Sequence, residues 1–451
     1  VDGRLKFFSD APSILFKSVD FFSSCFYYYL GNQRRIFCSG KARSFLSFHG
    51  RIFIMDYKKY FSKIAYEMKP SGIRKYFDIA ATMPDCISLG VGEPNFVTPE
   101  VGCKAAIKSI EDGITRYTSN SGLIQLRKLI SRYMETRYGL SYNPDNEIIT
   151  TVGVSEGIDI AFMALLNPGD EVLLPEPCFV SYAPAVLLAG GVPVVVKCVK
   201  ENGFIITPEM LEEKITPKTK AILMCYPNNP TGAIMTKEQL QAVAPVFEKH
   251  DLIVLSDEVY SELTYGGLNH VSIASLPRMR ERTIVFNGFS KGFAMTGWRL
   301  GYVCAPKEII EQVLKIHQYM IMCAPTAAQY AAAALLEDGL SNDFAEVAKM
   351  REEYDRKRKF LYRSLGEMGL ECFEPKGAFY MFPSVESTGV DGETFVERLI
   401  HEYKVCCPAG IAFGEAGYYH IRISYAYAME QIEKGVERMA KFVKQLRSEM
   451  K

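Results

Sequence analysis

Several signals that would place this chain in a common class of protein are missing from its sequence. None of the twelve cysteines forms a Cys-x-x-Cys pair, and the six histidines show no metal-ligand spacing. Basic and acidic residues balance at 52 each, so nothing indicates a nucleic-acid partner. No apolar run is long enough to cross a bilayer. These absences favour a cytoplasmic protein with reduced thiols and with no metal, membrane or nucleic-acid partner.

Residues 1–54 do not conform to the rest of the chain. They contain no methionine, the first being Met55, and Arg and Lys outnumber Asp and Glu there. A basic, acid-poor leader is typical of a targeting segment, which would direct import into an organelle. The alternative is a translated upstream region, with Met55 as the true start, and we favour it. Either way, we expect residues 1–54 to add no catalytic group.

From Met55 onward, short apolar runs alternate with segments of helical length. The runs cover residues 147–152, 171–174, 192–196, 221–224, 252–255 and 283–286, and a helix is expected from Ser155. Strands that are apolar on both faces predict a mostly parallel sheet covered by helices, which is an α/β fold. Beyond residue 330, helices at 331–336 and 343–370 and strands at 377–382 and 420–425 indicate a second, smaller α+β domain.

Polar residues follow the predicted strands where each strand ends, which is where ligands bind in open α/β sheets. Lys291 offers a primary amine, Asp257 a carboxylate, Tyr260 a phenol, Asn229 an amide and Arg299 a guanidinium. Together they match one flat, phosphorylated aldehyde, pyridoxal phosphate. Lys291 would form an imine with the aldehyde and then carry a proton to and from the substrate Cα.

Each partner of the lysine has a distinct expected role. Asp257 would pair with the pyridine nitrogen, which keeps the ring electron-withdrawing. Tyr260, expected one helical turn later, and Asn229 would hydrogen-bond the ring 3′ oxygen. Taken alone, Asp257 reads as a helix N-cap, Tyr260 as core and Asn229 as a turn residue before Pro230.

The phosphate would be bound at the turn that follows residues 147–152. Arg299 matches a phosphate with two parallel hydrogen bonds. Val154, Ser155 and Glu156 open a helix whose free backbone N–H groups favour an anion. Phe179 would stack on the ring, although ordinary core packing explains it equally well.

Arg422 lies inside an apolar run, where a charge requires a partner. We expect that partner to be the α-carboxylate of an amino-acid substrate, held by two hydrogen bonds. A structural ion pair is the alternative.

These residues, in this order, resemble the class I/II pyridoxal-phosphate-dependent aminotransferases of fold type I, from about Ile64 to the C-terminus. The matching motifs are Gly92-Glu93-Pro94, Pro227-Asn228-Asn229-Pro230-Thr231-Gly232, Ser256-Asp257-Glu258-Val259-Tyr260, Ser290-Lys291, Thr296-Gly297-Trp298-Arg299 and Gly377-Ala378-Phe379-Tyr380. The sequence is most similar to the bacterial branch of aspartate and aromatic aminotransferases.

The resemblance implies a large domain (96–330) with a seven-stranded sheet, an N-terminal arm with part of a small domain (55–95), and a small C-terminal domain (331–451). It implies a homodimer in which Tyr117 reaches the phosphate bound to the partner subunit. It also places Gly92 and Asn229, together with Arg422, at the substrate. It also implies amino-acid and 2-oxo-acid substrates, with glutamate and 2-oxoglutarate as one pair. One departure is Gly288, where many members have a Ser or Thr that touches phosphate; Ser290 is the candidate replacement. Another is Phe179, where Trp or Tyr is frequent.

Two other functions compete with transamination. One is a lyase of the same fold that eliminates at the β or γ carbon, like carbon–sulfur lyases and aminocyclopropane-carboxylate synthases. The other is a non-catalytic regulator, which would carry an N-terminal DNA-binding module that residues 1–54 do not resemble. The 296–299 motif favours the aminotransferase. The side-chain preference for the substrate stays open, because Arg422 accounts for the α-carboxylate alone.

Overall fold

The computed structural model describes residues 55–450. The chain divides into two compact units, Val1–Phe61 and Ser62–Lys451. In the first unit the described residues include the 3-10 helix η1 (Tyr57–Tyr60), and the predictions made for residues 1–54 lie outside the described residues. The central sheet and the candidate site belong to the second unit.

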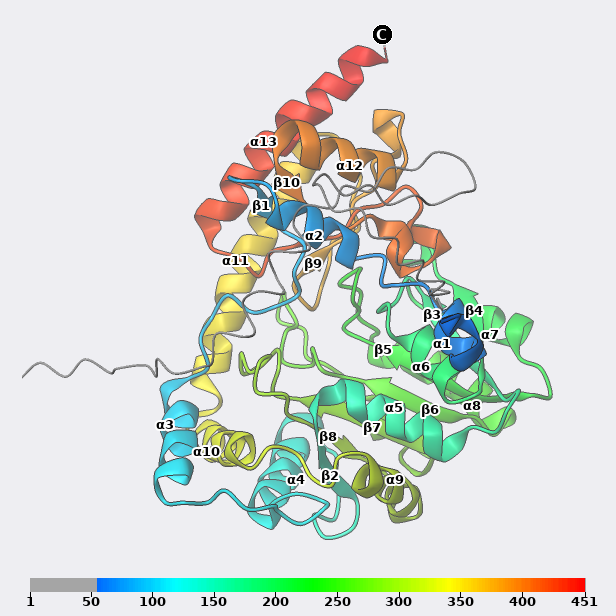
Figure 1. Ribbon diagram of the computed structural model, residues 1–451, viewed down its shortest axis with the longest axis vertical. Helices are drawn as coiled ribbons and strands as arrows, with labels where there is room; N and C mark the ends of the chain where they lie inside the picture. Colours follow the sequence, from blue (N-terminus) through cyan, green and yellow to red (C-terminus); the bar gives the residue numbers. More distant parts are fainter. Residues whose placement is uncertain (1–54, 451) are drawn as a thin grey trace, which may run out of the picture. The chain divides into compact units, whose positions relative to one another are not determined.

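A seven-stranded sheet with the order β2-β8-β7-β6-β5-β3-β4 forms the centre of the second unit (Figure 1). Its strands are β2 (Ile148–Thr151), β3 (Glu171–Glu176), β4 (Val192–Lys197), β5 (Thr219–Cys225), β6 (Ile253–Asp257), β7 (Thr283–Gly288) and β8 (Gly301–Cys304). All pairs are parallel except those made by β8, which is antiparallel to β2 and β7. The structure therefore confirms the mostly parallel sheet.

Helices cover both faces of this sheet, which explains why its strands are apolar on both faces. On β5, Ile222 and Met224 pack with residues of α7 and α8, whereas Leu223 and Cys225 pack with residues of α5, α6 and α9. Successive side chains of a strand point to opposite faces, so one strand contributes to both cores. The covering helices are α5 (Gly153–Leu165), α6 (Tyr182–Leu188), α7 (Pro208–Lys214), α8 (Lys237–Lys249) and α9 (Lys307–Met320).

Two small sheets lie outside the central one, and the first of them joins segments from both ends of the second unit. β1 (Ile87–Ser88) pairs in parallel with β10 (Val405–Cys406), and β9 (Tyr380–Met381) pairs antiparallel with β11 (Ile423–Ser424). This arrangement confirms a smaller α+β part built from both chain ends, while the exact domain boundaries stay predictions. The remaining helices are α1 (Lys63–Glu67), α2 (Arg74–Ala81), α3 (Glu100–Glu111), α4 (Ile124–Tyr138), α10 (Thr326–Asn342), α11 (Ala345–Glu367), α12 (Gly392–Tyr403) and α13 (Met429–Glu449). Within residues 55–450, no helix has the length and apolar character required to cross a bilayer.

Candidate active site

A cavity of about 650 Å³ opens at the carboxyl edge of the central sheet. Four parallel strands deliver residues to it, because β6 ends at Asp257 and β3, β5 and β7 end shortly before Phe179, Asn229 and Lys291. The predicted site residues that line it are Gly92, Val154, Ser155, Phe179, Asn229, Asp257, Tyr260, Ser290, Lys291, Arg299 and Arg422. The fold thus brings together residues that lie far apart in the sequence.

Lys291 presents its amine inside this cavity. Its Nζ donates a hydrogen bond to the Gly92 carbonyl oxygen at 2.6 Å. Burial lowers the pKa of Lys291 to about 8, with the charge of Glu93 opposing this shift and that of Arg422 reinforcing it. The amine therefore loses its proton far more readily than an exposed lysine, as a nucleophile or a proton carrier requires.

Asp257 is held by two donors. Tyr182 donates its hydroxyl to Oδ2 at 2.6 Å, and the Val259 backbone N–H donates to Oδ1 at 3.2 Å. Burial raises the pKa of Asp257 to about 6, and the bond from Tyr182 opposes that rise. The carboxylate is thus ionised at neutral pH and able to pair with a protonated ring nitrogen.

Tyr260 also faces the cavity, but it lies in a hydrogen-bonded turn and not in the expected helical turn. Its hydroxyl is 2.8 Å from that of Tyr380 on β9. Burial raises the pKa of Tyr260 well above its usual value, so the phenol keeps its proton and remains a donor. Tyr380 belongs to the Gly377-Ala378-Phe379-Tyr380 motif, but the sequence did not assign it to the site. The sequence did not assign Tyr182 to the site either.

Arg422 is the deepest cation of the cavity, with 3% of its surface exposed. It donates from Nη1 to the Asn229 Oδ1 at 2.9 Å and from Nη2 to the Gly90 carbonyl oxygen at 2.5 Å. Its guanidinium lies 4.5 Å from the ring centre of Tyr380 and 4.7 Å from that of Phe413. Among the described residues, its hydrogen-bond acceptors are this amide and this carbonyl oxygen and not a carboxylate, and its buried Nε has no acceptor. A buried charge in this state fits the carboxylate of a ligand.

The start of α5 and Arg299, which also line the cavity, have the features of an anion site. Gly153 begins α5 with φ at +74°, and a Cβ there would lie 2.7 Å from Nη2 of Arg299. The first N–H groups of a helix have no partner within it, so Val154 and Ser155 present donors next to this guanidinium. This arrangement fits a phosphate.

Two predicted residues lie outside the cavity lining. Glu156 turns its carboxylate to the Val152 backbone N–H at 2.5 Å and to Nδ1 of His317 at 2.6 Å, so its expected contribution is limited to its backbone. Tyr117 is 79% exposed, and its role toward a partner subunit stays a prediction. Gly288 has no room for a side chain, because an added Cβ would lie 2.9 Å from Gly301 Cα; Ser290 lines the cavity instead.

The sequence reasoning missed two acidic side chains of the lining, Glu93 and Asp159. Glu93 lies in the Gly92-Glu93-Pro94 motif, of which only Gly92 was assigned to the site. Asp159 lies within the helix expected from residue 155. Among residues 55–450, no group of three or more His, Cys, Asp or Glu residues is placed to hold a metal ion. The donors present match pyridoxal phosphate: an amine at the centre, a carboxylate for the ring nitrogen and an anion site at one end.

Comparisons with known proteins agree with this chemistry. The family model for aminotransferase class I and II matches residues 84–439. The chain is 52% identical to the putative aminotransferase YugH of Bacillus subtilis, over 85% of this chain and 98% of that protein. It is 47% identical to an aspartate aminotransferase of Pyrococcus abyssi, over 84% of this chain and 97% of that protein.

A solved structure gives the same result for the fold. The crystal structure of an aromatic aminotransferase from Pyrococcus horikoshii matches with a TM-score of 0.78 and 45% sequence identity, over 82% of this chain and 99% of that one. Family, fold and site chemistry point in one direction. The chain belongs to the class I and II aminotransferases and is a pyridoxal-phosphate-dependent aminotransferase.

Proposed function

We propose that the cavity around Lys291 is the site of transamination between an L-amino acid and a 2-oxo acid in two successive half-reactions. The observation that carries this proposal is the position of Lys291, whose amine lies in one cavity with Asp257 and Arg422. One cavity thus holds the lysine, a partner for the cofactor ring and a partner for the substrate carboxylate.

Pyridoxal phosphate, when bound, supplies an aldehyde carbon for bonding to amines and a ring that takes up an electron pair. Lys291 would hold the cofactor through its aldehyde carbon, and its neutral amine would carry the proton to and from the substrate Cα. Asp257 would keep a proton on the ring nitrogen. Tyr260 and Asn229 would donate to the ring oxygen, and Phe179 would pack against the ring face.

Arg299, Ser290 and the first turn of α5, with Val154, Ser155 and the backbone of Glu156, hold the phosphate. Arg422 would bind the substrate α-carboxylate. The carbonyl oxygen of Gly92 accepts a hydrogen bond from Lys291, which supports a position of Gly92 beside the substrate. Arginine suits both tasks because its planar fork offers two parallel donors to a carboxylate or a phosphate.

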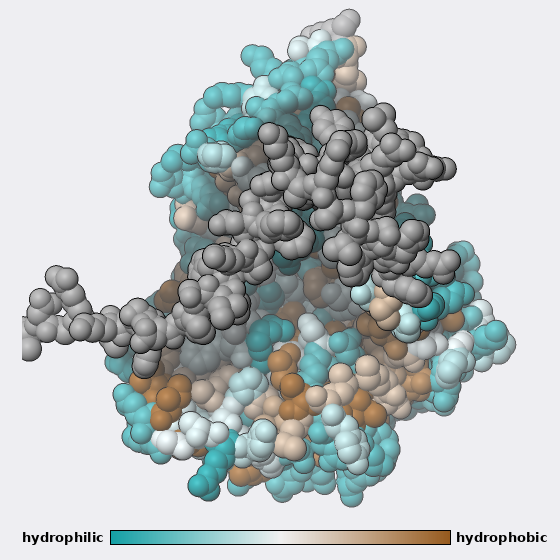
Figure 2. Space-filling model, viewed as in Figure 1, coloured by the Kyte–Doolittle hydropathy of each residue, from teal (hydrophilic) through white to brown (hydrophobic). Residues whose placement is uncertain are grey.

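The enzyme acts as a homodimer in this proposal. Apolar side chains are exposed on α3 and on the segment after α9, and Figure 2 shows hydrophobic residues over α3 and α5 on one face. Tyr117 is also exposed. It lies near the segment after α9, since Asn120, three residues on, donates a hydrogen bond to the Met322 carbonyl oxygen. Such exposed apolar surface is typical of an interface. The ten described cysteines are free, which supports a reducing compartment such as the cytoplasm.

Glutamate and 2-oxoglutarate form one expected substrate pair. The relatives are named for aspartate and for aromatic amino acids, so both classes are candidates for the other pair. A lyase reaction is not favoured, because the named relatives are aminotransferases.

The role of Lys291 is tested by Lys291→Ala. We expect the variant to fold, as judged by circular dichroism, and to lose the visible absorbance of the lysine-bound cofactor. Its turnover should fall by at least about a thousandfold, a typical loss for a nucleophile that also transfers the proton. Lys307→Ala, on the exposed start of α9, is the control and should behave as wild type. Turnover in Lys291→Ala equal to that of wild type would refute the assignment.

A further inference from the structure

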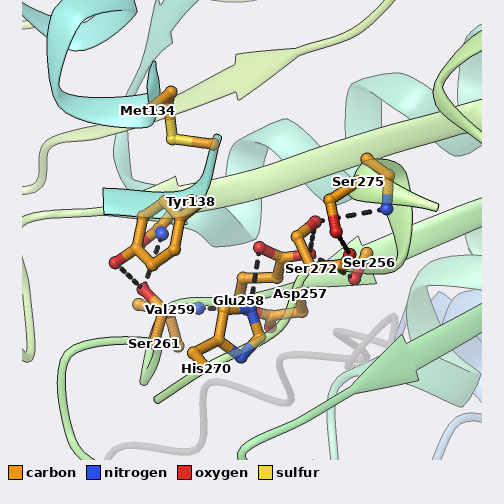
Figure 3. Close-up of polar contacts among 12 residues, drawn as sticks. Met134, Tyr138, Ser256, Asp257, Glu258, Val259, Ser261, His270, Ser272 and Ser275 are labelled. Carbon is orange, nitrogen blue, oxygen red and sulfur yellow. Dashed lines mark hydrogen bonds and ion pairs between the residues drawn. The ribbon is translucent and has the colours of Figure 1, made fainter. Parts of the chain in front are cut away.

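Glu258 directly follows Asp257 in the chain, but its side chain does not line the cavity. It points into the protein body and is almost completely buried, with 1% of the side chain exposed (Figure 3). Its Oε1 accepts hydrogen bonds from Ser256 Oγ at 2.9 Å and from Ser272 Oγ at 2.6 Å. Its Oε2 lies 2.9 Å from Nε2 of His270. One carboxylate therefore connects β6 to the segment that contains residues 270–272.

Burying a carboxylate is costly unless its acceptor positions are filled, and here three donors fill them. The pairing with His270 is also enclosed, since 7% of that side chain is exposed. The reaction assigned to the cavity uses neither residue. Because burying the Glu258 carboxylate costs free energy and Glu258 lies one residue from Asp257, we expect its role to concern its neighbours.

The segment from Asp257 to Glu262 directs its side chains to two sides. Asp257, Val259 and Tyr260 line the cavity. Ser261 and Glu262 turn away. Tyr138 donates its hydroxyl to Ser261 Oγ at 2.7 Å (Figure 3). Arg137 donates to Glu262 Oε2 at 2.7 Å. Two buried carboxylates thus anchor the segment, one before Tyr260 and one after it.

The two carboxylates are linked through the side chains of His270 and Tyr138. The ring of His270, which pairs with Glu258, packs edge-on against that of Tyr138, with centroids 5.6 Å apart, and Tyr138 Oη lies 3.1 Å from Glu262 Oε1. We therefore expect a shift at one carboxylate to affect the other, because packed interiors have little free volume.

We propose that Glu258, paired with His270, is a positioning residue that fixes the turn after β6 so that Asp257 and Tyr260 face the cofactor together. The inference rests on the proposed function of the cavity, because it assigns Asp257 to the ring nitrogen. A carboxylate suits this task since both of its oxygens accept. Glutamine keeps the length and one acceptor, whereas alanine leaves two serine hydroxyls and a histidine without their partner.

Glu258→Ala, Glu258→Gln and a control, Glu212→Ala, test the proposal in the cofactor-loaded enzyme. Glu212 pairs with Nε2 of His250 at 3.0 Å, so the control removes a Glu–His pair of the same chemistry that lies at the surface. The first readout is the pH midpoint of the visible absorbance of the bound cofactor, which depends on how Asp257 meets the ring. The second is the affinity for pyridoxal phosphate, and the third is kcat/KM.

In Glu258→Ala we expect the absorbance midpoint to move by about one pH unit, the size of a tenfold change in pairing. We expect kcat/KM to fall about 10- to 100-fold, as it does when partners that orient the ligands of a site are removed. Glu258→Gln should recover most of both losses, and Glu212→Ala should match wild type. If Glu258→Ala does not fold, Ser272→Ala and His270→Ala are read in the same way.

An unchanged midpoint and kcat/KM within twofold of wild type in folded Glu258→Ala would overturn the proposal, as would equal losses in Glu212→Ala. Failure of the proposed function is a separate result. It would appear as a wild-type enzyme that binds the cofactor, shows the absorbance midpoint and does not transaminate.

Discussion

Lys291 and Asp257 share one cavity, and burial shifts their pKa values toward each other. The pKa of Lys291 falls to about 8 and that of Asp257 rises to about 6, because in both cases burial penalises the charged form. Between these values the carboxylate is ionised and the lysine gains a neutral fraction much larger than that of an exposed lysine. Neutral pH is therefore a range in which Asp257 and Lys291 have the protonation states that the proposed reaction requires, a charged carboxylate beside the ring and an amine able to accept a proton.

This lowered pKa predicts how the cofactor-free protein takes up pyridoxal phosphate. The neutral amine is the form that bonds to the aldehyde, and its fraction rises as the pH passes through the pKa of Lys291. We expect the rate of appearance of the visible band to rise tenfold per pH unit below about 8 and to level off above it. A stopped-flow series from pH 6 to 10 measures this rate. A rate that keeps rising to pH 10 would show that the lysine behaves as an exposed one.

Helices and strands position these side chains, and most of them could be predicted. Strands such as β5 and β6 are apolar on both faces and end at polar residues, which makes both their type and their functional edge readable. β8 was not predicted, because Gly301–Cys304 has only four residues and follows the 296–299 motif, of which only Arg299 was assigned a role. Periodicity in the sequence also does not reveal that β8 pairs antiparallel with β7.

Part of the site could not be predicted from the sequence, because it depends on contacts that only the folded chain creates. Tyr182 and Tyr380 are phenols in apolar surroundings, and only their contacts with Asp257 and Tyr260 distinguish them from ordinary core residues. The pairing of Glu258 with His270 joins residues whose relation depends on the path of a loop. Lys291, Asp257 and Arg422 were readable because a charge within or beside an apolar run requires a reason.

The close approach of β8 to α5 predicts a defect at the phosphate end of the cavity. A Cβ on Gly301 would lie 2.7 Å from backbone atoms of Gly153 and Val154, at the start of α5. We expect Gly301→Ala to lower the free energy of unfolding by about 1–3 kcal/mol, a usual cost of overpacking, and to weaken cofactor binding. Denaturant unfolding and a cofactor titration measure the two effects.

Gly366→Ala is the matched control, because Gly366 lies within α11 and a Cβ there meets no atom within 4 Å. Alanine is favoured over glycine in a helix by about 1 kcal/mol, so this variant should be at least as stable as wild type. Equal stability and equal cofactor affinity in both variants would show that α5 tolerates displacement.

The proposed homodimer gives a role to Tyr117, whose side chain is exposed to solvent in a single chain. Tyr117 is 79% exposed, yet Tyr117→Phe should weaken cofactor binding about tenfold or more if its hydroxyl reaches the phosphate bound to a partner subunit. Light scattering should give twice the mass of one chain. Tyr362→Phe on α11 is the control for loss of a surface hydroxyl. A monomer with full cofactor affinity would contradict this part of the proposal.

The most direct test of the account is the first half-reaction observed alone. Glutamate is added, without an acceptor, to the purified enzyme loaded with pyridoxal phosphate, and the visible spectrum is recorded. We predict that the band of the lysine-bound cofactor converts to that of the pyridoxamine form and returns when a 2-oxo acid is added. A band that persists with glutamate would contradict transamination of glutamate, and release of pyruvate and ammonia from a cysteine-type donor added in place of glutamate would favour a lyase.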